Sequence, residues 1–539
     1  MPAPSTQTMV DGLVEANVDL SSSPYYSHDM APTTRAERRW GMRDIAVLWI
    51  SMSACIPTYM LASSLIDGGM DWQQAVLTVF LGNVIVLIPM VLNAHAGTKY
   101  GIPFPVYCRA SFGILGANVP ALLRALVACG WFGIQTWIGG EAIYTLLKEF
   151  YPAWGELPLL FANPADPAST GLGINGAQLV CFLAFWLVNM FVIYKGIESI
   201  RLLLNVKAPL LIVLGLALLA WAYFAAGGFG EMLTRPSQFA DDGPKAGKFW
   251  SFFVLALTGN VSFWATLALN IPDFSRYARS QRDQVLGQAI GLPTTMGLYS
   301  FIGVAVTSAA MVIYKDLPAD DAKRLWDPVF LLSLFENRAV LIIAMASLAI
   351  ATLATNIAAN VVSPANDFAH MWPRMISFRV GGFITGVIGI LIQPWHLVAN
   401  GDVYIGKWLV GYSLLLGAVG GVLIADYVAL RRMQLDLAAL YRKNGPYWYV
   451  TGVNPIALAA LLVGMSLCIP GFLGTIGKIY LAGDLRAPEG AETWPAIWGD
   501  LYNYAWFTSF GAAFVTYLGL MLTFGRKYLR QAASRGLEH

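Results

Sequence analysis

The chain has little charge for its size, and this scarcity excludes a soluble protein. Of its 539 residues, 57% are hydrophobic and 12% are charged, whereas soluble domains carry roughly 25% charged residues. The net charge of +2 also lacks the strong basic excess that is typical of proteins that bind nucleic acids. The composition therefore predicts an integral membrane protein, surrounded by a lipid bilayer and without a nucleic-acid partner.

The chain also lacks the residue patterns of common catalytic and metal centres. It has five cysteines and five histidines, and their spacing predicts neither a disulfide framework nor a zinc site. The motifs HExxH, GxxxxGK[ST] and GxSxG are absent. We therefore predict that the protein is not an enzyme, that it has no catalytic residues and no cofactor, and that it is not a nucleotide-driven pump.

The N-terminal segment lacks an apolar core of the kind that a secretory signal peptide contains. Its residues are polar and include many Ser, Thr and Pro. We expect no cleavable signal here, and a disordered cytoplasmic tail over residues 1–43.

Long apolar runs are what the chain has in abundance. Runs of about 20 apolar residues match the roughly 30 Å hydrocarbon core of a bilayer, so they predict membrane-spanning α-helices. No loop between them is long enough to form a separate soluble domain. Hydropathy predicts about twelve spans, near 44–66, 73–95, 117–146, 176–194, 205–226, 250–270, 290–313, 338–363, 380–397, 404–425, 452–472 and 504–524.

The distribution of positive charge predicts the orientation of these spans. An even number of spans places both termini on one side. If the N-terminus is cytoplasmic, the inner segments hold about twice as many Lys and Arg as the outer ones. We therefore expect a multi-pass protein of the cell inner membrane, with cytoplasmic termini that include a tail over residues 525–539.

A short pattern recurs in the first and sixth spans. Residues 55–59 read Cys-Ile-Pro-Thr-Tyr and residues 270–274 read Asn-Ile-Pro-Asp-Phe. Interruptions by Gly or Pro at matching positions of two halves are typical of inverted-repeat transporters with broken helices. The alternative is chance recurrence of a short pattern.

Polar and aromatic residues inside the spans predict a binding site. Trp131 and Gln135 are four positions apart and therefore share a helix face. An indole offers a flat stacking surface, and an amide offers a donor and an acceptor. Together they suit a planar ring that carries C=O and N–H groups. The alternative, an interfacial Trp beside a packing Gln, fits a mid-span position less well.

The eighth span carries a polar stripe of Thr352, Thr355, Asn356 and Asn360 among alanines. Such a stripe either binds a cation or polar ligand, or joins helices by hydrogen bonds, and the pattern by itself does not choose between them. In the sixth span, Gly259 is a candidate point of unwinding.

Few charged residues lie in or near the spans. Glu141 is a candidate proton relay or a locally paired group. We expect Arg124 to snorkel towards the interface, and Asp273 and Arg276 to pair or to cap a helix. None of the four has the features of a residue that strongly couples transport to the movement of an ion.

Several stretches, in order, resemble the nucleobase–cation symporter-1 family, which includes hydantoin, allantoin, cytosine and uracil permeases. The similarity covers about residues 35–445 and looks most like that of the allantoin permeases. Its motifs are Ile56-Pro57-Thr58-Tyr59, residues 95–105 (HAGTKYGIPFP), residues 109–113 (RASFG), residues 116–121 (GANVPA), residues 131–136 (WFGIQT), Trp264-Ala265-Thr266, residues 269–274 (LNIPDF), and residues 356–365 (NIAANVVSPA).

The resemblance implies an all-α membrane fold with a five-plus-five inverted repeat like that of the leucine transporter. Spans one and six would be broken, and two further helices would be accessory. The first repeat would cover residues 44–226, the second residues 250–425 and the accessory helices residues 452–524.

The resemblance also implies roles for individual residues. Trp131 and Trp264 would sandwich the substrate, while Gln135 and Asn360 would hydrogen-bond its edge. Cys55 stands where relatives carry an amide, and Phe263 would narrow the pocket. A sodium site would map onto Ser51, Ala54, Ala351, Ala354 and Thr355, but Ala354 lacks the expected hydroxyl, so the site would be incomplete.

We therefore predict a cation-coupled symporter that imports a small planar heterocycle such as allantoin, a hydantoin, uracil or cytosine by alternating access. The coupling ion would be a proton or sodium. No obligatory protein partner is evident. The alternatives are a membrane receptor that binds the same ligands without moving them, and a passive channel.

Overall fold

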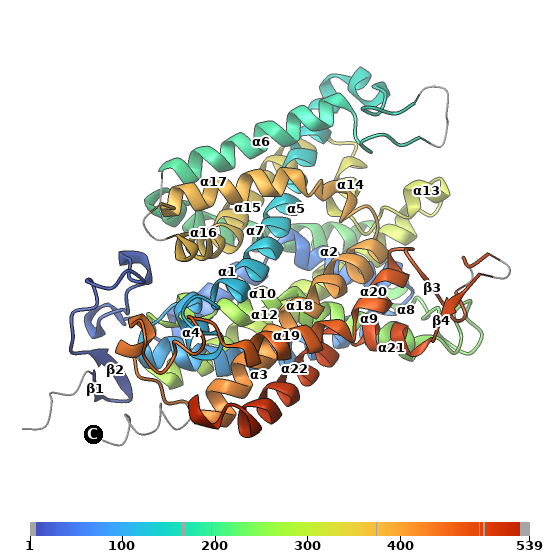
Figure 1. Cartoon of the computed structure of the whole chain (residues 1–539). Coiled ribbons are helices and arrows are strands. Elements are labelled where there is room, and N and C mark those ends of the chain that lie inside the picture. The colour runs from blue at the N-terminus through green and yellow to red at the C-terminus, as the bar shows by residue number, and fades with distance from the viewer. Residues whose placement is uncertain are drawn as a thin grey trace, which may run out of the picture.

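Helices dominate the structure and run side by side through its middle (Figure 1). The computed structural model describes residues 7–163, 169–195, 197–372, 375–484, 486–488 and 491–528. Within these residues, eight helices are long and apolar enough to cross a membrane, or nine if a bent pair counts as one span. Three shorter apolar helices accompany them. Every range predicted as a span is occupied by helix.

The two predicted repeats each contain helices for five spans. The first holds α1 (Met42–Ser53), α2 (Ile56–Asp67), α3 (Trp72–Tyr100), α5 (Asn118–Phe150), α6 (Gly176–Lys195) and α7 (Ile197–Ala225). The second holds α9 (Phe249–Phe263), α10 (Ala265–Asn270), α11 (Pro272–Ser275), α12 (Gln281–Ile313), α15 (Arg338–Asn360), α16 (Val362–Met371), α17 (Phe378–Leu391) and α18 (Val410–Ile424), the last flanked by the π-helical turns η5 (Val403–Leu409) and η6 (Ala425–Leu430).

Helices at equivalent places in the two halves pack against each other. The contacts join α3 to α12, α5 to α15 and α6 to α17. The second, third and fourth spans of one half thus meet the second, third and fourth of the other, as expected of a five-plus-five repeat.

The remaining elements lie outside this arrangement. The last two spans are α19 (Pro455–Ser466), continued by α20 (Ile469–Thr475), and α22 (Ala505–Thr523), which packs along α18 and α19. Short pieces complete the chain: α4 (Phe104–Phe112), α8 (Phe229–Thr234), α13 (Ala319–Ala322), α14 (Pro328–Ser333), α21 (Ile497–Asn503), the 3-10 turns η3 (Pro152–Glu156), η4 (Pro394–His396) and η7 (Ala438–Tyr441), and a parallel pair of two-residue strands, β3 (Tyr480–Leu481) and β4 (Thr493–Trp494).

The first span is broken between α1 and α2, as predicted. The two helices are bent by 58°. Cys55 between them is extended, with φ −152° and ψ 161°. Pro57 follows in the first turn of α2, where its missing N–H costs no helical hydrogen bond. The break leaves backbone groups at the end of α1 without helical partners.

The second break lies at Trp264, so the predicted unwinding at Gly259 is wrong. Helix α9 continues through Gly259 to Phe263, and Trp264 (φ −101°, ψ 5°) separates it from α10. Gly259 serves close packing instead, because a Cβ there would lie 3.0 Å from the side chain of Ile405. The repeated motif with Pro272 begins α11 beyond α10 and does not mark this break.

The N-terminal segment is ordered where the structure describes it, in contrast to the disordered tail predicted for residues 1–43. It forms the antiparallel hairpin of β1 (Gln7–Val10) and β2 (Leu13–Ala16), followed by the turns η1 (His28–Met30) and η2 (Arg35–Glu37). Arg38 is 3% exposed and donates to the carbonyls of Val14, Thr33, Thr98 and Lys99. These contacts to distant residues, which composition does not reveal, hold the segment in place.

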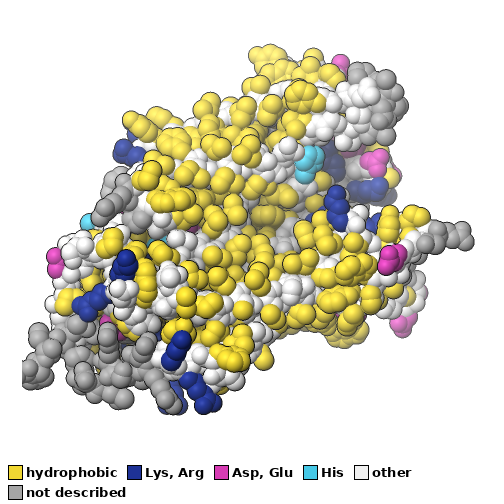
Figure 2. Space-filling view, in the orientation of Figure 1, with side chains coloured by type: hydrophobic (Ala, Val, Ile, Leu, Met, Phe, Trp, Pro, Cys, Tyr) yellow, Lys and Arg dark blue, Asp and Glu magenta, His cyan; other side chains and the backbone are white. Residues whose placement is uncertain are grey.

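On the face shown in Figure 2, hydrophobic side chains cover the middle of the molecule. Charged side chains gather towards its two ends, one of which holds the N-terminal hairpin (Figures 1 and 2). This distribution suits a protein that is surrounded by lipid at its middle and by water at both ends.

Candidate functional site

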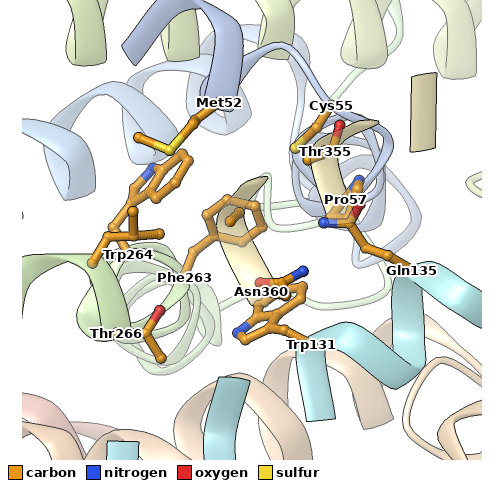
Figure 3. Close-up of a pocket in the computed structure, with 12 residues that line it drawn as sticks. Met52, Cys55, Pro57, Trp131, Gln135, Phe263, Trp264, Thr266, Thr355 and Asn360 are labelled. Atoms are coloured by element: carbon orange, nitrogen blue, oxygen red, sulfur yellow. The ribbon is translucent and has the colours of Figure 1, made fainter. Parts of the chain in front are cut away.

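A small cavity lies where the two broken spans meet α5 and α15. Figure 3 shows its lining, to which both breaks contribute. The structure brings together all six residues predicted to bind substrate, along with Thr355. The lining residues are Met52, Cys55, Pro57, Trp131, Gln135, Phe263, Trp264, Thr266, Leu267, Thr355, Ala359 and Asn360.

Phe263 lies between the two indoles that were expected to sandwich a substrate (Figure 3). Its ring centroid is 5.2 Å from that of Trp131 and 5.0 Å from that of Trp264, with edge-to-face angles of 75° and 83°. The cavity that remains has a volume of about 30 Å³. This is roughly the volume that one molecule takes up in liquid water. In this conformation Phe263 occupies the space between the indoles.

Three buried polar atoms of the lining have no hydrogen-bond partner among the described residues. They are Oε1 of Gln135, an acceptor, and the Nε1 donors of Trp131 and Trp264. The three side chains are 4%, 5% and 3% exposed. Leaving such a group buried and unpaired costs roughly 1–3 kcal/mol. The lining thus holds one acceptor and two donors that a ligand could satisfy.

Asn356 holds Asn360 at the edge of the cavity. The Nδ2 of Asn356 contacts Oγ1 of Thr136 at 3.0 Å, the carbonyl of Phe132 at 3.2 Å and Oδ1 of Asn189 at 3.2 Å. Its Oδ1 accepts from Nδ2 of Asn360 at 3.1 Å. The polar stripe of the eighth span therefore divides between two roles: Thr355 and Asn360 line the cavity, and Asn356 joins α15 to α5 and α6.

Two tyrosines of the tenth span contact the two breaks. The hydroxyl of Tyr404 donates to the carbonyl of Pro57 at 3.3 Å, and that of Tyr412 donates to the carbonyl of Ser262 at 2.7 Å. Both rings also pack on Trp131. The sequence analysis missed these residues, although the spacing of Trp408 and Tyr412, four positions apart like Trp131 and Gln135, is the same signal.

Cys55 lies at the break itself, as the residue before α2. Its Sγ is 3.2 Å from Oγ1 of Thr58. The cavity is also lined by Met52, Thr266, Leu267 and Ala359, which have small or apolar side chains and were not predicted as site residues. Their chemistry carries no signal that separates them from ordinary core residues.

The residues proposed for sodium lie on two helices that contact each other, α1 and α15. Ser51 is in the last turn of α1, and Ala54 follows its end. On α15, Oγ1 of Thr355 donates to the carbonyl of Ala351 at 2.9 Å. Ala354 contributes no side-chain oxygen, so the set is one hydroxyl short of the one that the resemblance implies.

The charged candidates have local partners. Glu141 accepts from Gln178 at 3.0 Å. Asp273 accepts from the backbone N–H of Phe104 at 2.8 Å and thereby caps the start of α4. Arg276 contacts the carbonyl of Asp29 instead of Asp273. The expected snorkelling of Arg124 is wrong, because its side chain is 1% exposed and pairs with Asp367.

Comparison with known proteins places this geometry in a family. Residues 32–494 match the family model described as permease for cytosine/purines, uracil, thiamine, allantoin. The chain is 42% identical to a purine–uracil permease of Arabidopsis thaliana over 93% of this chain and 78% of the other. It is 35% identical to an allantoin permease of Bacillus subtilis over 92% and 93%. Overall identity thus does not single out the allantoin permeases.

Solved structures show the same fold. The inward-facing conformation of the transporter Mhp1 superimposes with a TM-score of 0.71 and 21% identity, covering 95% of this chain and 97% of that one. The closed conformation of Mhp1, a nucleobase-cation-symport-1 family transporter with bromovinylhydantoin bound, gives 0.70 and 22%, covering 93% and 96%.

Proposed function

The chain belongs to the family of permeases for cytosine/purines, uracil, thiamine and allantoin, and from this premise we propose that it imports a planar heterocycle through the cavity at its helix breaks. It is a multi-pass membrane transporter and not an enzyme. The observation that carries the substrate proposal is the pair of buried, unpaired atoms of Gln135 and Trp264 in an aromatic cavity.

The chemistry of the lining supports a ring that carries adjacent C=O and N–H groups. A ligand N–H would donate to Oε1 of Gln135, and a ligand carbonyl would accept from the indole N–H of Trp264. Asn360, held by Asn356, would contact the same edge. Allantoin, hydantoins, uracil, cytosine and purines all present such edges, and relatives are named for several of them.

Phe263 has to leave its place between the indoles before a heterocycle can bind. Pockets for small molecules have volumes of roughly 300–1,000 Å³, whereas the present cavity has about 30 Å³. We infer that the planar ring of the substrate replaces the ring of Phe263 against Trp131 or Trp264. Binding would then depend on a rearrangement at the second break.

A second, larger cavity supports a release path. It has a volume of about 1090 Å³ and lies at the end of the molecule that holds the N-terminal segment. Asp273 and Phe274, after the second broken span, and Asn366, after α15, line it together with residues 26–40. We infer that this end is cytoplasmic, as the positive-inside rule predicts, and that the membrane is the cell inner membrane.

The coupling ion in this proposal is a proton, or sodium bound weakly. The family of Mhp1 is named for cation symport. Carbonyls of Ser51, Ala54 and Ala351 and the hydroxyl of Thr355 would hold sodium, and the missing hydroxyl at Ala354 weakens that set. No protein partner is needed.

A ligand screen tests the substrate class. Purified protein would be heated with allantoin, hydantoins, uracil, cytosine and purines, with and without sodium. The true substrate should raise the melting temperature of the wild type and should not raise that of Trp131→Ala. Trp250→Ala is the matched control, because Trp250 is 71% exposed. A Trp131→Ala protein that responds like the wild type would contradict the proposed site.

Proteoliposomes separate a transporter from the two alternatives. A carrier shows counterflow, in which internal unlabelled substrate drives accumulation of labelled substrate. A channel equilibrates the substrate without accumulation, and a receptor moves none. Equilibration without counterflow would overturn the symport mechanism.

A further inference from the structure

A third cavity, separate from the two above, lies at the end of the molecule that holds the N-terminal hairpin. It has a volume of about 430 Å³, within the range of small-molecule pockets. Helices α4 and α16, which supply Arg109 and His370, lie at that end in Figure 1. The cavity shares no lining residue with the central site.

Arg109 gives this cavity a buried positive charge. The side chain is 1% exposed, and among the described residues it forms no ion pair with an aspartate or glutamate. Of the other buried arginines among the described residues, Arg124 and Arg431 each have a carboxylate within 2.7 Å, whereas Arg38 donates to backbone carbonyls alone. Burial lowers the pKa of Arg109 to about 10, so it remains charged at neutral pH.

The hydrogen bonds of Arg109 leave part of its guanidinium unused. Nε donates to Nε2 of His370 at 3.1 Å, Nη1 to the carbonyl of Leu440 at 3.2 Å, and Nη2 to the carbonyl of Tyr25 at 2.9 Å. A guanidinium has five N–H donors. Two N–H groups therefore have no hydrogen-bond acceptor among the described residues. The guanidinium also lies over the ring of Tyr441, 5.0 Å from its centroid, and no carboxylate neutralises its charge.

His370 supplies a further donor. Because its Nε2 accepts from Arg109, the neutral ring carries its proton on Nδ1. This Nδ1 has no partner among the described residues, although the side chain is only 5% exposed. Burying such a group without a partner costs free energy that a bound acceptor would recover.

The rest of the lining reaches the surface and is apolar except for Tyr25 and Asn118, whose Oδ1 has no hydrogen-bond partner among the described residues. Leu115, Trp372 and Met375 are 40%, 55% and 80% exposed and form an apolar rim. An apolar wall beside a buried cation and a neutral donor at the end of a membrane protein is chemistry that suits acidic lipid headgroups. We propose that this cavity binds a phosphate group that carries an apolar chain, with Arg109 and His370 as its donors.

The phosphate could come from an acidic phospholipid or from a soluble phosphate compound, and binding measurements distinguish these sources. The purified protein in detergent would be mixed with phosphatidylglycerol, phosphatidylcholine, glycerol phosphate or inorganic phosphate, and bound mass and melting temperature recorded. We expect phosphatidylglycerol to bind and to raise the melting temperature, and phosphatidylcholine to have little effect. Equal binding of glycerol phosphate would show that the cavity recognises the phosphate of a soluble compound without an apolar chain, and would overturn the proposal in this form.

Two kinds of variant test the location. His370→Phe removes the donor and should weaken binding about tenfold or more, the effect of losing a hydrogen bond to a charged group. Because this change also removes a partner of Arg109, Met375→Asp provides an independent test: it places a negative charge on the exposed rim and should weaken binding by a similar factor. Met375→Gln is its neutral control. Absence of binding by every phosphate probe, or equal binding by Met375→Asp and Met375→Gln, would overturn the proposal.

Discussion

Arg124 of α5 and Asp367 of α16 form an ion pair of 2.5 Å in which each side chain is 1% exposed. Arg124 precedes Trp131 by seven positions, and Asp367 follows Asn360 by seven positions. Seven residues are about two turns of helix. The pair therefore joins the helix that supplies Trp131 and Gln135 to the chain that supplies Asn360, two turns from the cavity.

Breaking this pair from one side should destabilise the protein strongly. Arg124→Met or Asp367→Leu leaves an uncompensated buried charge, which costs about 3–5 kcal/mol. The double variant should lose less than either single one, because neither charge remains. Thermal unfolding in detergent measures the effect, and Arg338→Met, which removes an exposed pair with Glu149, should change little. Additive losses in the double variant would contradict this account.

Shortening Phe263 should widen the range of substrates. Phe263→Ala removes the ring between the two indoles and enlarges a cavity of about 30 Å³. We expect bulkier heterocycles to compete better, roughly tenfold or more, relative to the preferred small one. Competition of labelled uptake by a series of substituted rings measures this. Phe263→Leu, which keeps most of the volume, should stay near the wild type. An unchanged competition series would show that Phe263 does not limit the pocket.

Restoring a hydroxyl on α15 should increase dependence on sodium. Ala354→Ser adds the side-chain oxygen that the proposed set of Ser51, Ala54, Ala351 and Thr355 lacks. We expect the sodium concentration for half-maximal uptake to fall at least several-fold. Ala358→Ser, on the same helix but outside that set, is the control. A variant with the same sodium dependence as the wild type would argue for proton coupling.

Asn356 should matter for binding although it does not line the cavity. Asn356→Ala removes the acceptor that holds Asn360 and the contacts to Thr136 and Asn189. Contacts of this kind in membranes are worth about 0.6 kcal/mol each, so we expect a loss of about 1–2 kcal/mol in stability and a several-fold rise in KM. A variant with unchanged KM would show that Asn360 does not need its hydrogen bond to Asn356 for substrate binding.

A large part of the architecture was predictable because membrane helices are local structures. In a bilayer the backbone polar groups of a span must form hydrogen bonds within their own helix. An apolar run of sufficient length is therefore expected to form a membrane-spanning helix. The break at Cys55 was also predictable, since Pro57 marks it. The gathering of Trp131, Gln135, Trp264 and Asn360 could be expected only through the family resemblance, because no local rule joins residues so far apart.

Composition and interactions within a few turns of helix are enough to predict the class of protein, the ranges of its spans and the chemical types of side chain available to a ligand. The packed fold was needed to show that the second break lies at Trp264, that Phe263 occupies the space between the indoles, that Arg124 meets Asp367 and that the N-terminal segment packs on the core. Each of these depends on burial against residues distant in the chain. The free energy of burying a group is set by its neighbours, and the linear sequence does not state which neighbours those are.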